Sequence, residues 1–163
     1  MQTGGLEPIP QVDPTSSFSS TSVTKKYGDL TFSTNSDGTL SYVSSNTSVA
    51  TVSSTGTITI KGVGSTTITA STTETSSYFA DSKTMTLTVN KGTLSVSINP
   101  TVTAIEYGQT IASSGVSGGT VKDQAGNTIT GGIWSWQSPN TKPTGIGTVS
   151  CVVVYTLNNV NYE

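Results

Sequence analysis

The chain of 163 residues contains no histidine, no arginine and a single cysteine, Cys151. Without histidine there is no imidazole general base, no Ser-His or Cys-His pair and no histidine metal ligand. Without arginine, the usual bidentate group for phosphate and carboxylate is missing. One cysteine forms no internal disulfide and no cysteine metal site. We therefore expect a non-enzymatic protein with no catalytic residue, no metal site and no cofactor.

Charge and long apolar runs are also scarce. Only 10% of the residues are charged, all seven basic residues are lysine, and the net charge is −2. Such a chain cannot neutralise a run of phosphates, so we expect no nucleic-acid partner. No stretch approaches the roughly 20 apolar residues of a membrane helix, and we expect no membrane insertion. No basic start with an apolar run follows Met1, so, if residue 1 is the natural start, we expect no export by the usual route.

Small hydroxyl side chains dominate what is present, with 26 serines and 32 threonines. Threonine is interleaved with valine, isoleucine and tyrosine in alternation, which is a strand composition rather than a linker composition. Apolar pairs at period two occur at Leu40 and Tyr42, Ala50 and Val52, Ile58 and Ile60, Ile68 and Ala70, and Met85, Leu87 and Val89. Strands that recur roughly every 8 to 12 residues between turn residues predict an all-β sandwich or barrel.

A second series of alternating residues begins after Lys91, and the two series align. Tyr27-Gly28-Asp29 corresponds to Tyr107-Gly108-Gln109 at an offset of 80, and Tyr78 corresponds to Tyr162 at an offset of 84. The sequence therefore predicts two tandem repeats of about 80 residues, residues 17–90 and 91–163, preceded by an extended N-terminal arm, residues 1–16.

The alignment also predicts that the second domain lacks its last strand. After Tyr78 the first repeat continues through Met85–Val89, whereas the second stops after Tyr162. A sandwich short of one strand has an unpaired edge and an open core groove. Three explanations stay open: the second repeat is truncated, its fold is naturally shorter, or another segment fills the groove, such as the arm of a neighbouring copy by strand addition.

The segment 149–155 carries apolar residues on both faces. Val149, Cys151, Val153 and Tyr155 share one face, and Val152 and Val154 the other. This pattern predicts a central strand that is buried on both sides, with Cys151 as a buried, inert thiol.

The arm is predicted to anchor the chain to a protein partner, which is either a capsid or a neighbouring subunit. Its spaced prolines disfavour a helix or a central strand. The expected anchoring residues are Leu6, Pro8, Ile9, Pro10, Val12 and Pro14.

Three runs of the first repeat resemble the bacterial immunoglobulin-like (Ig-like) domain, group 2. They are Ser44–Ser53, the Gly56-Thr57-Ile58-Thr59 turn and Lys61–Ala70. The second repeat resembles a related Ig-like repeat of bacterial surface proteins, through Tyr107-Gly108-Gln109, Ser117-Gly118-Gly119 and the Trp134 strand. The resemblance implies two tandem Ig-like β-sandwiches, each of the seven-strand type, that serve as spacer, adhesin or surface modules; such domains also occur in bacteriophage virions.

Several residues have both a functional and a structural interpretation. Trp134 and Trp136 lie on one strand face and form either a glycan platform or, as we favour, core. Asp29, Asp37, Asp81 and Asp123 are scattered, which favours turn and cap roles over calcium binding. An isopeptide cross-link from Lys25, Lys26 or Lys83 would need a buried lysine with an acid beside it, and nothing in the sequence singles one out. Asn46 fits a glycosylation pattern, but a turn role is favoured.

Three functional hypotheses follow. The first is a bacteriophage virion surface component, such as a capsid decoration or a head or tail protein, located on the virion and touching host glycans weakly. The second is a fragment of a bacterial cell-surface adhesin or stalk, located outside the cell. The third, ranked lower, is a carbohydrate-binding module that uses the two tryptophans.

Overall fold

The fold of this computed structural model is described for residues 20–29, 32–33, 41–74 and 79–163. Within these residues it is all-β, as the sequence predicts, with one 3₁₀ turn, η1 (Ile111–Ser113), and no α-helix. The chain divides into two compact units, Met1–Asn90 (unit 1) and Lys91–Glu163 (unit 2). The predicted arm and its anchoring residues lie outside the described residues, as do Leu40 and Asp37.

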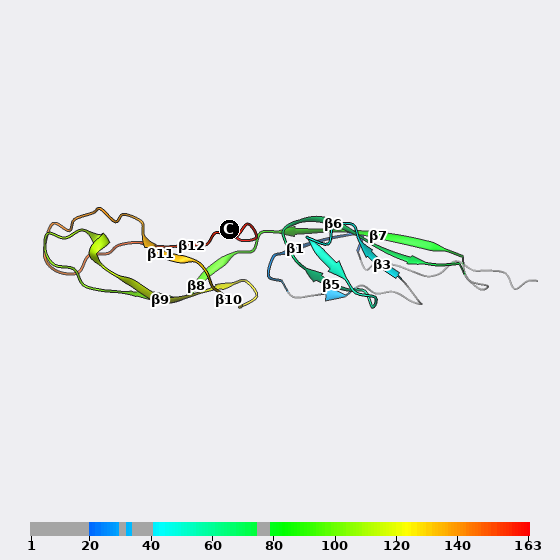
Figure 1. Cartoon of the computed structure of the whole chain (residues 1–163), viewed down its shortest axis with the longest axis horizontal. Helices are drawn as coiled ribbons and strands as arrows, with labels where there is room; N and C mark the ends of the chain where they lie inside the picture. Colours follow the sequence, from blue (N-terminus) through cyan, green and yellow to red (C-terminus); the bar gives the residue numbers. More distant parts are fainter. Residues whose placement is uncertain (1–19, 30–31, 34–40, 75–78) are drawn as a thin grey trace, which may run out of the picture. The chain divides into compact units, whose positions relative to one another are not determined.

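Unit 1 has a four-stranded sheet in the order β1-β7-β6-β3 (Figure 1). These strands are β1 (Ser22–Lys26), β3 (Ser41–Ser44), β6 (Gly64–Thr72) and β7 (Asp81–Asn90). β6 pairs antiparallel with both β3 and β7, whereas β1 runs parallel to β7 from Ser22↔Thr86 to Lys26↔Asn90. The last strand of the unit therefore lies between β6 and the first strand.

A second sheet of unit 1 has the order β2-β5-β4. Its strands are β2 (Phe32–Ser33), β4 (Ala50–Val52) and β5 (Thr57–Ile60), all paired antiparallel. One buried cluster joins residues of both sheets: Val49, Ala50, Ile58, Ile68, Met85, Leu87 and Val89. The three residues from β7 alternate, because side chains two apart share one face of a strand. Full burial of such a side chain stabilises a fold by about 1.5–3 kcal/mol.

A buried hydroxyl in β6 joins this core to the neighbouring loop. Thr66 is 3% exposed, and its Oγ1 accepts the Asn46 N–H at 2.9 Å. The same oxygen lies 2.9 Å from Ser44 Oγ and 3.3 Å from Ser45 Oγ. The Asn46 side chain in turn accepts the Ser48 N–H at 3.1 Å, so the predicted turn role of Asn46 is confirmed.

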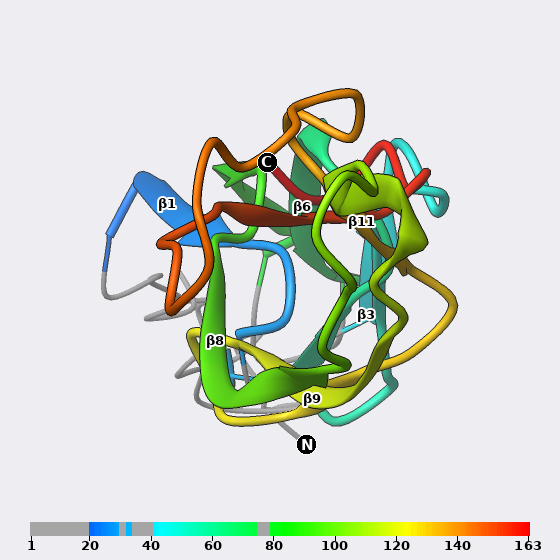
Figure 2. The same cartoon turned by 90° about the vertical axis from the view of Figure 1, so that its left-hand side faces the viewer.

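Unit 2 has a three-stranded sheet, β10-β9-β8, and a separate pair, β11-β12 (Figure 1). Figure 2 shows β8 and β9 side by side. The strands are β8 (Leu94–Val102), β9 (Val116–Asp123), β10 (Thr128–Ile129), β11 (Ile133–Trp136) and β12 (Val153–Thr156). All pairings are antiparallel, with a register irregularity in β8 between Val96 and Ile98. In this fully described unit the buried apolar residues are Ile111 and Val121, against eight described in unit 1.

The prediction of a central strand at 149–155 is wrong. β12 begins only at Val153 and pairs with β11 alone. Val149 and Val152 are 50% and 59% exposed, and Cys151 is exposed rather than buried. The alternation did specify a strand, but burial on both faces needs a second neighbouring strand, and unit 2 has none there.

Candidate functional site: a groove in unit 2

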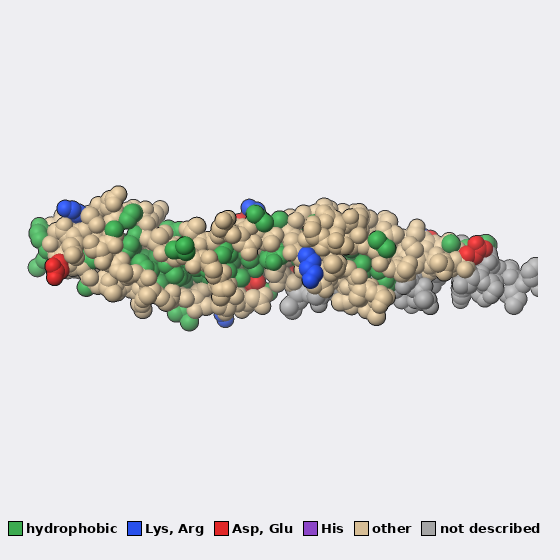
Figure 3. Space-filling view, viewed as in Figure 1, with side chains coloured by type: hydrophobic (Ala, Val, Ile, Leu, Met, Phe, Trp, Pro, Cys, Tyr) green, Lys and Arg blue, Asp and Glu red, His purple; other side chains and the backbone are tan. Residues whose placement is uncertain are grey.

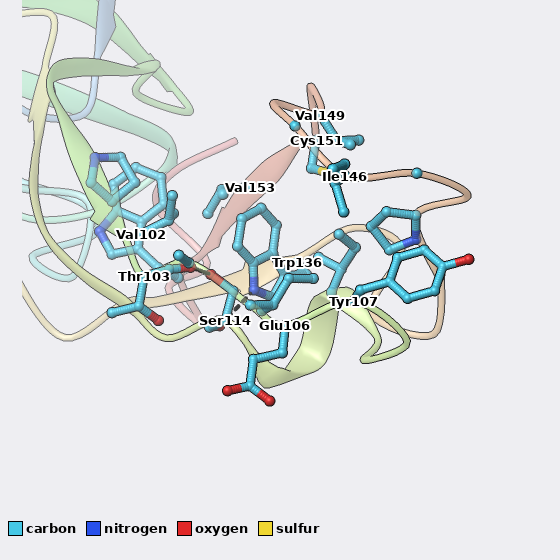
Figure 4. Close-up of a pocket in the computed structure, with 18 of the residues that line it drawn as sticks. Val102, Thr103, Glu106, Tyr107, Ser114, Trp136, Ile146, Val149, Cys151 and Val153 are labelled. Carbon is cyan, nitrogen blue, oxygen red and sulfur yellow. Dashed lines mark hydrogen bonds between the residues drawn. The ribbon is translucent and has the colours of Figure 1, made fainter.

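An open groove of about 590 Å³ runs through unit 2 and is the candidate functional site (Figure 4). We call it the unit-2 groove. It is lined by residues from 96–108, by Ile111, Ser114, Trp134 and Trp136, and by residues from 143–153. Figure 4 shows the Trp136 indole between Val102 and Thr103 on one side and Ile146, Val149 and Cys151 on the other.

The two tryptophans project from one face of β11 and are both half-buried. The Trp136 Nε1–H donates to the Ser114 carbonyl at 2.9 Å, which fixes the ring in the groove. The Trp134 ring packs on Tyr155, with ring centroids 5.0 Å apart and planes at 59°. The rings are thus neither the fully buried core residues nor the fully exposed platform that the sequence leaves open. One edge of each is fixed by unit 2, and both contribute to the groove wall.

The groove lining is unusually exposed for apolar side chains. Val96, Val102 and Val149 are each about half exposed, while Tyr107 is 74% and Ile146 92% exposed. Hydrophobic side chains form visible patches over unit 2 in Figure 3, where charged groups are few. Contiguous exposed apolar surface on a soluble protein usually marks a contact that the isolated chain lacks.

The Tyr-Gly turn of unit 1 has a defined hydrogen-bond pattern. The Lys26 N–H donates to Asp29 Oδ2 at 2.8 Å, and the Asp29 N–H donates to the Lys26 carbonyl at 3.1 Å. Gly28, between them, has φ +92°. The turn ends β1, and the Tyr27 N–H next to it donates to Asn90, the last residue of β7, at 2.8 Å.

The Tyr-Gly turn of unit 2 has the same pattern. The Glu106 N–H donates to Gln109 Oε1 at 2.8 Å, and the Gln109 N–H donates to the Glu106 carbonyl at 3.1 Å. Gly108 has φ +93°. The two turns found by sequence alignment therefore share one geometry, and the run before the second turn, residues 102–106, occupies the place of β1.

The run 102–106 differs from β1 in having no strand beside it. Val102 ends β8, and residues 103–106 belong to no strand. The Thr103 N–H donates to Gly115 at 3.0 Å, but no hydrogen-bond partner is found within unit 2 for the N–H groups of Ala104, Ile105 and Tyr107. In unit 1, Tyr27 packs against the buried cluster, whereas Tyr107 projects into solvent.

The predicted turn roles of Asp29 and Asp123 are confirmed. Asp123 is 4% exposed, and its carboxylate accepts the N–H groups of Ala125 (3.0 Å) and Asn127 (2.8 Å). It also accepts Asn127 Nδ2 at 3.0 Å and Tyr162 Oη–H at 3.5 Å. Burial alone would raise the pKa of Asp123, but these hydrogen bonds, led by the Asn127 side chain, outweigh it and hold the pKa below 3.8.

The remaining acids and lysines give no metal or cross-link geometry among the described residues. Asp81 pairs with Lys83 at 3.0 Å, and the Lys83 side chain is 51% exposed, so this lysine is not the buried one that a cross-link needs. The described ranges hold no group of three or more histidine, cysteine, aspartate or glutamate side chains suited to a metal. Over the same residues, no helix has the length and apolar character to cross a membrane.

Sequence reasoning predicts an open groove and, separately, two tryptophans, but it does not place the tryptophans in the groove. It also misses Tyr107, Ile146 and Cys151 as lining residues. The alignment of the two Tyr-Gly turns holds the signal for Tyr107, because its counterpart Tyr27 packs against the buried cluster of unit 1. The 143–147 segment carries no comparable pattern.

Part of unit 1 is similar in sequence to a known immunoglobulin-like domain family. Residues 31–74 match the family model of the intimin immunoglobulin-like domain, which covers 44 of the 163 residues. The matched range includes β2 to β6 and the buried residues from Val49 to Ala70. No curated protein matches the chain. The finer assignment to group 2 and the second Ig-like repeat remain predictions.

Proposed function

We propose that the chain is a non-enzymatic structural module of a bacterial cell-surface adhesin, located outside the cell. The observation that carries this proposal is the match of unit 1 to an intimin Ig-like domain. This match favours the cell-surface hypothesis, and nothing in the comparison supports the virion hypothesis. A hydroxyl-rich surface with little charge also suits exposure to media of varying salt, because few surface interactions are then screened.

The strand order of unit 1 supports a role in bearing tension. The unit is entered at β1 and left at β7, and these strands are parallel neighbours. Ser22, at the entry, pairs beside Thr86, while the exit residue Asn90 pairs beside Lys26 at the other end of the ladder. Tension between the two ends therefore loads all hydrogen bonds of the pair together, in shear, rather than one after another.

Force spectroscopy on the full chain, with proline variants of β1, tests this role. The Tyr27 N–H points at β7, and N–H groups alternate edges along a strand, so Lys25 shares that edge and Thr24 does not. Lys25→Pro removes a donor from the ladder, whereas Thr24→Pro affects an outer edge where proline is tolerated. We expect Lys25→Pro to lower the unfolding force of unit 1, and Thr24→Pro to leave it close to that of the parent.

The control Lys25→Ala separates the loss of the N–H from the loss of the lysine side chain. If the parent and both proline variants unfold at the same force, the β1–β7 pair bears no load and the spacer role is contradicted.

A further inference from the structure

We propose that the unit-2 groove is an acceptor site for one peptide β-strand from outside residues 1–163. The strand would run antiparallel to the 149–156 segment and parallel to residues 102–106, and would present apolar side chains at alternate positions. This inference concerns the architecture of unit 2 and does not depend on the cell-surface role.

Unit 1 shows what fills this place. There the run before the Tyr-Gly turn, β1, is parallel to β7, and β7 is antiparallel to β6. Met85, Leu87 and Val89 of β7 project into the core and are each no more than 2% exposed. In unit 2 the turn and the run before it are present, and β12 pairs with the tryptophan strand β11 as β6 pairs with β3. The strand between them is the element that unit 2 does not contain.

The groove has the edges that such a strand needs. On one side, the N–H groups of Ile105 and Tyr107, which correspond to those of Lys25 and Tyr27 on the β7 edge of β1, have no partner within unit 2. On the other, β12 is bonded along one edge only, to β11. An exposed strand edge of this kind is a ready template for strand addition.

Parallel pairing already occurs at one point in unit 2. Gly92 and Tyr162 form a parallel β-bridge. The Gly92 N–H donates to the Asn161 carbonyl at 2.9 Å, and the Glu163 N–H donates to the Gly92 carbonyl at 3.0 Å. Parallel pairing alongside β8 is therefore compatible with this fold.

The lining favours a peptide over a sugar. Glu106 is the single charged residue among those that line the groove, and most of the rest are apolar. Trp136 donates its N–H to Ser114 and Trp134 packs on Tyr155, so both rings are held within unit 2 and are half-buried, whereas a sugar-stacking platform presents an exposed ring. Alternating valine, leucine or methionine side chains would instead cover Val102, Val149 and Val153.

Two extended chains test the proposal. In the first, which we call the alternating extension, a short Gly-Ser linker and the ten-residue sequence of β7 (81–90) follow Glu163. The linker gives the added strand a millimolar effective concentration at the groove. In the matched serine control, the copy of β7 carries serine at the positions that correspond to Met85, Leu87 and Val89, while the length and the linker are unchanged. The readouts are the alkylation rate of Cys151, the one thiol of the chain, which lines the groove, and the emission of Trp134 and Trp136.

We expect the alternating extension to slow alkylation of Cys151 by about tenfold or more, because thiol reactivity requires access, and to shift tryptophan emission to shorter wavelength. The serine control should match the parent chain. Equal behaviour of the two extensions would overturn the proposal. Protection of Cys151 in the parent by cellohexaose, without protection by the alternating extension, would also overturn it and assign the groove to a carbohydrate.

Discussion

Single polar side chains stabilise both units by closing turns and loops that a low-charge sequence cannot close with ion pairs. Thr66 does this in unit 1, where its buried hydroxyl accepts the Asn46 N–H. Asp123 does it in unit 2 for the 123–127 turn. Residue type and turn spacing predicted the role of Asp123, whereas the role of Thr66 was not predictable, because 32 threonines look alike until the fold selects one for burial.

Thr66→Val should destabilise unit 1 by about 1–3 kcal/mol, because the Asn46 N–H loses the buried Thr66 hydroxyl as its acceptor while the side-chain volume is kept. Thr86→Val, at an exposed position of β7, is the matched control and should change stability by less than about 0.5 kcal/mol. Urea unfolding followed by far-UV circular dichroism measures both. Equal effects of the two variants would show that the Thr66 hydroxyl is not a structural acceptor.

Asp123→Ala should destabilise unit 2 by about 2 kcal/mol at pH 7, because it removes a charged acceptor from three N–H groups. The pKa of Asp123 is lower in the folded chain than the ordinary value of 3.8, so its stabilisation is present above pH 3.8 and is lost as the pH falls further. The difference between parent and variant should therefore shrink below pH 3.8. A difference that is constant from pH 7 to pH 2.5 would contradict this role.

At the scale of strands and turns, the positions of single strands and turns were predictable from local pattern, but the strands that lie beside each of them were not. Period-two alternation placed β5 and β7, and the repeated Tyr-Gly-Asp/Gln triplet identified two turns that share φ and hydrogen bonds. The same kind of alternation at 149–155 led to a wrong prediction of burial on both faces. Burial of the second face requires another strand beside this segment, and the local pattern carries no information about that strand. The groove was likewise unpredictable in detail, since three separate segments form it.

Gly108→Ala tests the turn of unit 2. A Cβ at Gly108 meets no atom within 4 Å, so the expected cost of about 1–2 kcal/mol comes from the positive φ of +93° alone. Gly145 has equal space for a Cβ and is not among the glycines with positive φ. Gly145→Ala should therefore be neutral or slightly stabilising. Tryptophan-monitored denaturation reports on both, and equal effects would contradict the shared turn geometry.

At the scale of the whole molecule, the two units differ in how completely their cores are covered. Unit 1 buries Met85, Leu87 and Val89 of its last strand, while unit 2 leaves Tyr107 and Ile146 in solvent. Burial of apolar area is the dominant favourable term in folding, so unit 2 should be the less stable of the two.

Denaturant unfolding should accordingly show two transitions. Both tryptophans of the chain, Trp134 and Trp136, lie in unit 2, so their emission follows that unit alone, while circular dichroism follows both. We expect the tryptophan transition at lower urea concentration than the later part of the dichroism change. One coincident transition by both probes would show that the units have equal stability or unfold together.

The most direct test of the account is hydrogen exchange by mass spectrometry on the full chain, with the alternating extension and its serine control. We predict that the 103–107 and 148–152 segments exchange rapidly in the parent chain and in the control, while β6 and β7 are protected. The alternating extension should slow exchange in those two segments of unit 2 and leave unit 1 unchanged. Protection of both segments in the parent chain, or no difference between the two extensions, would contradict the claim that unit 2 accepts a final strand.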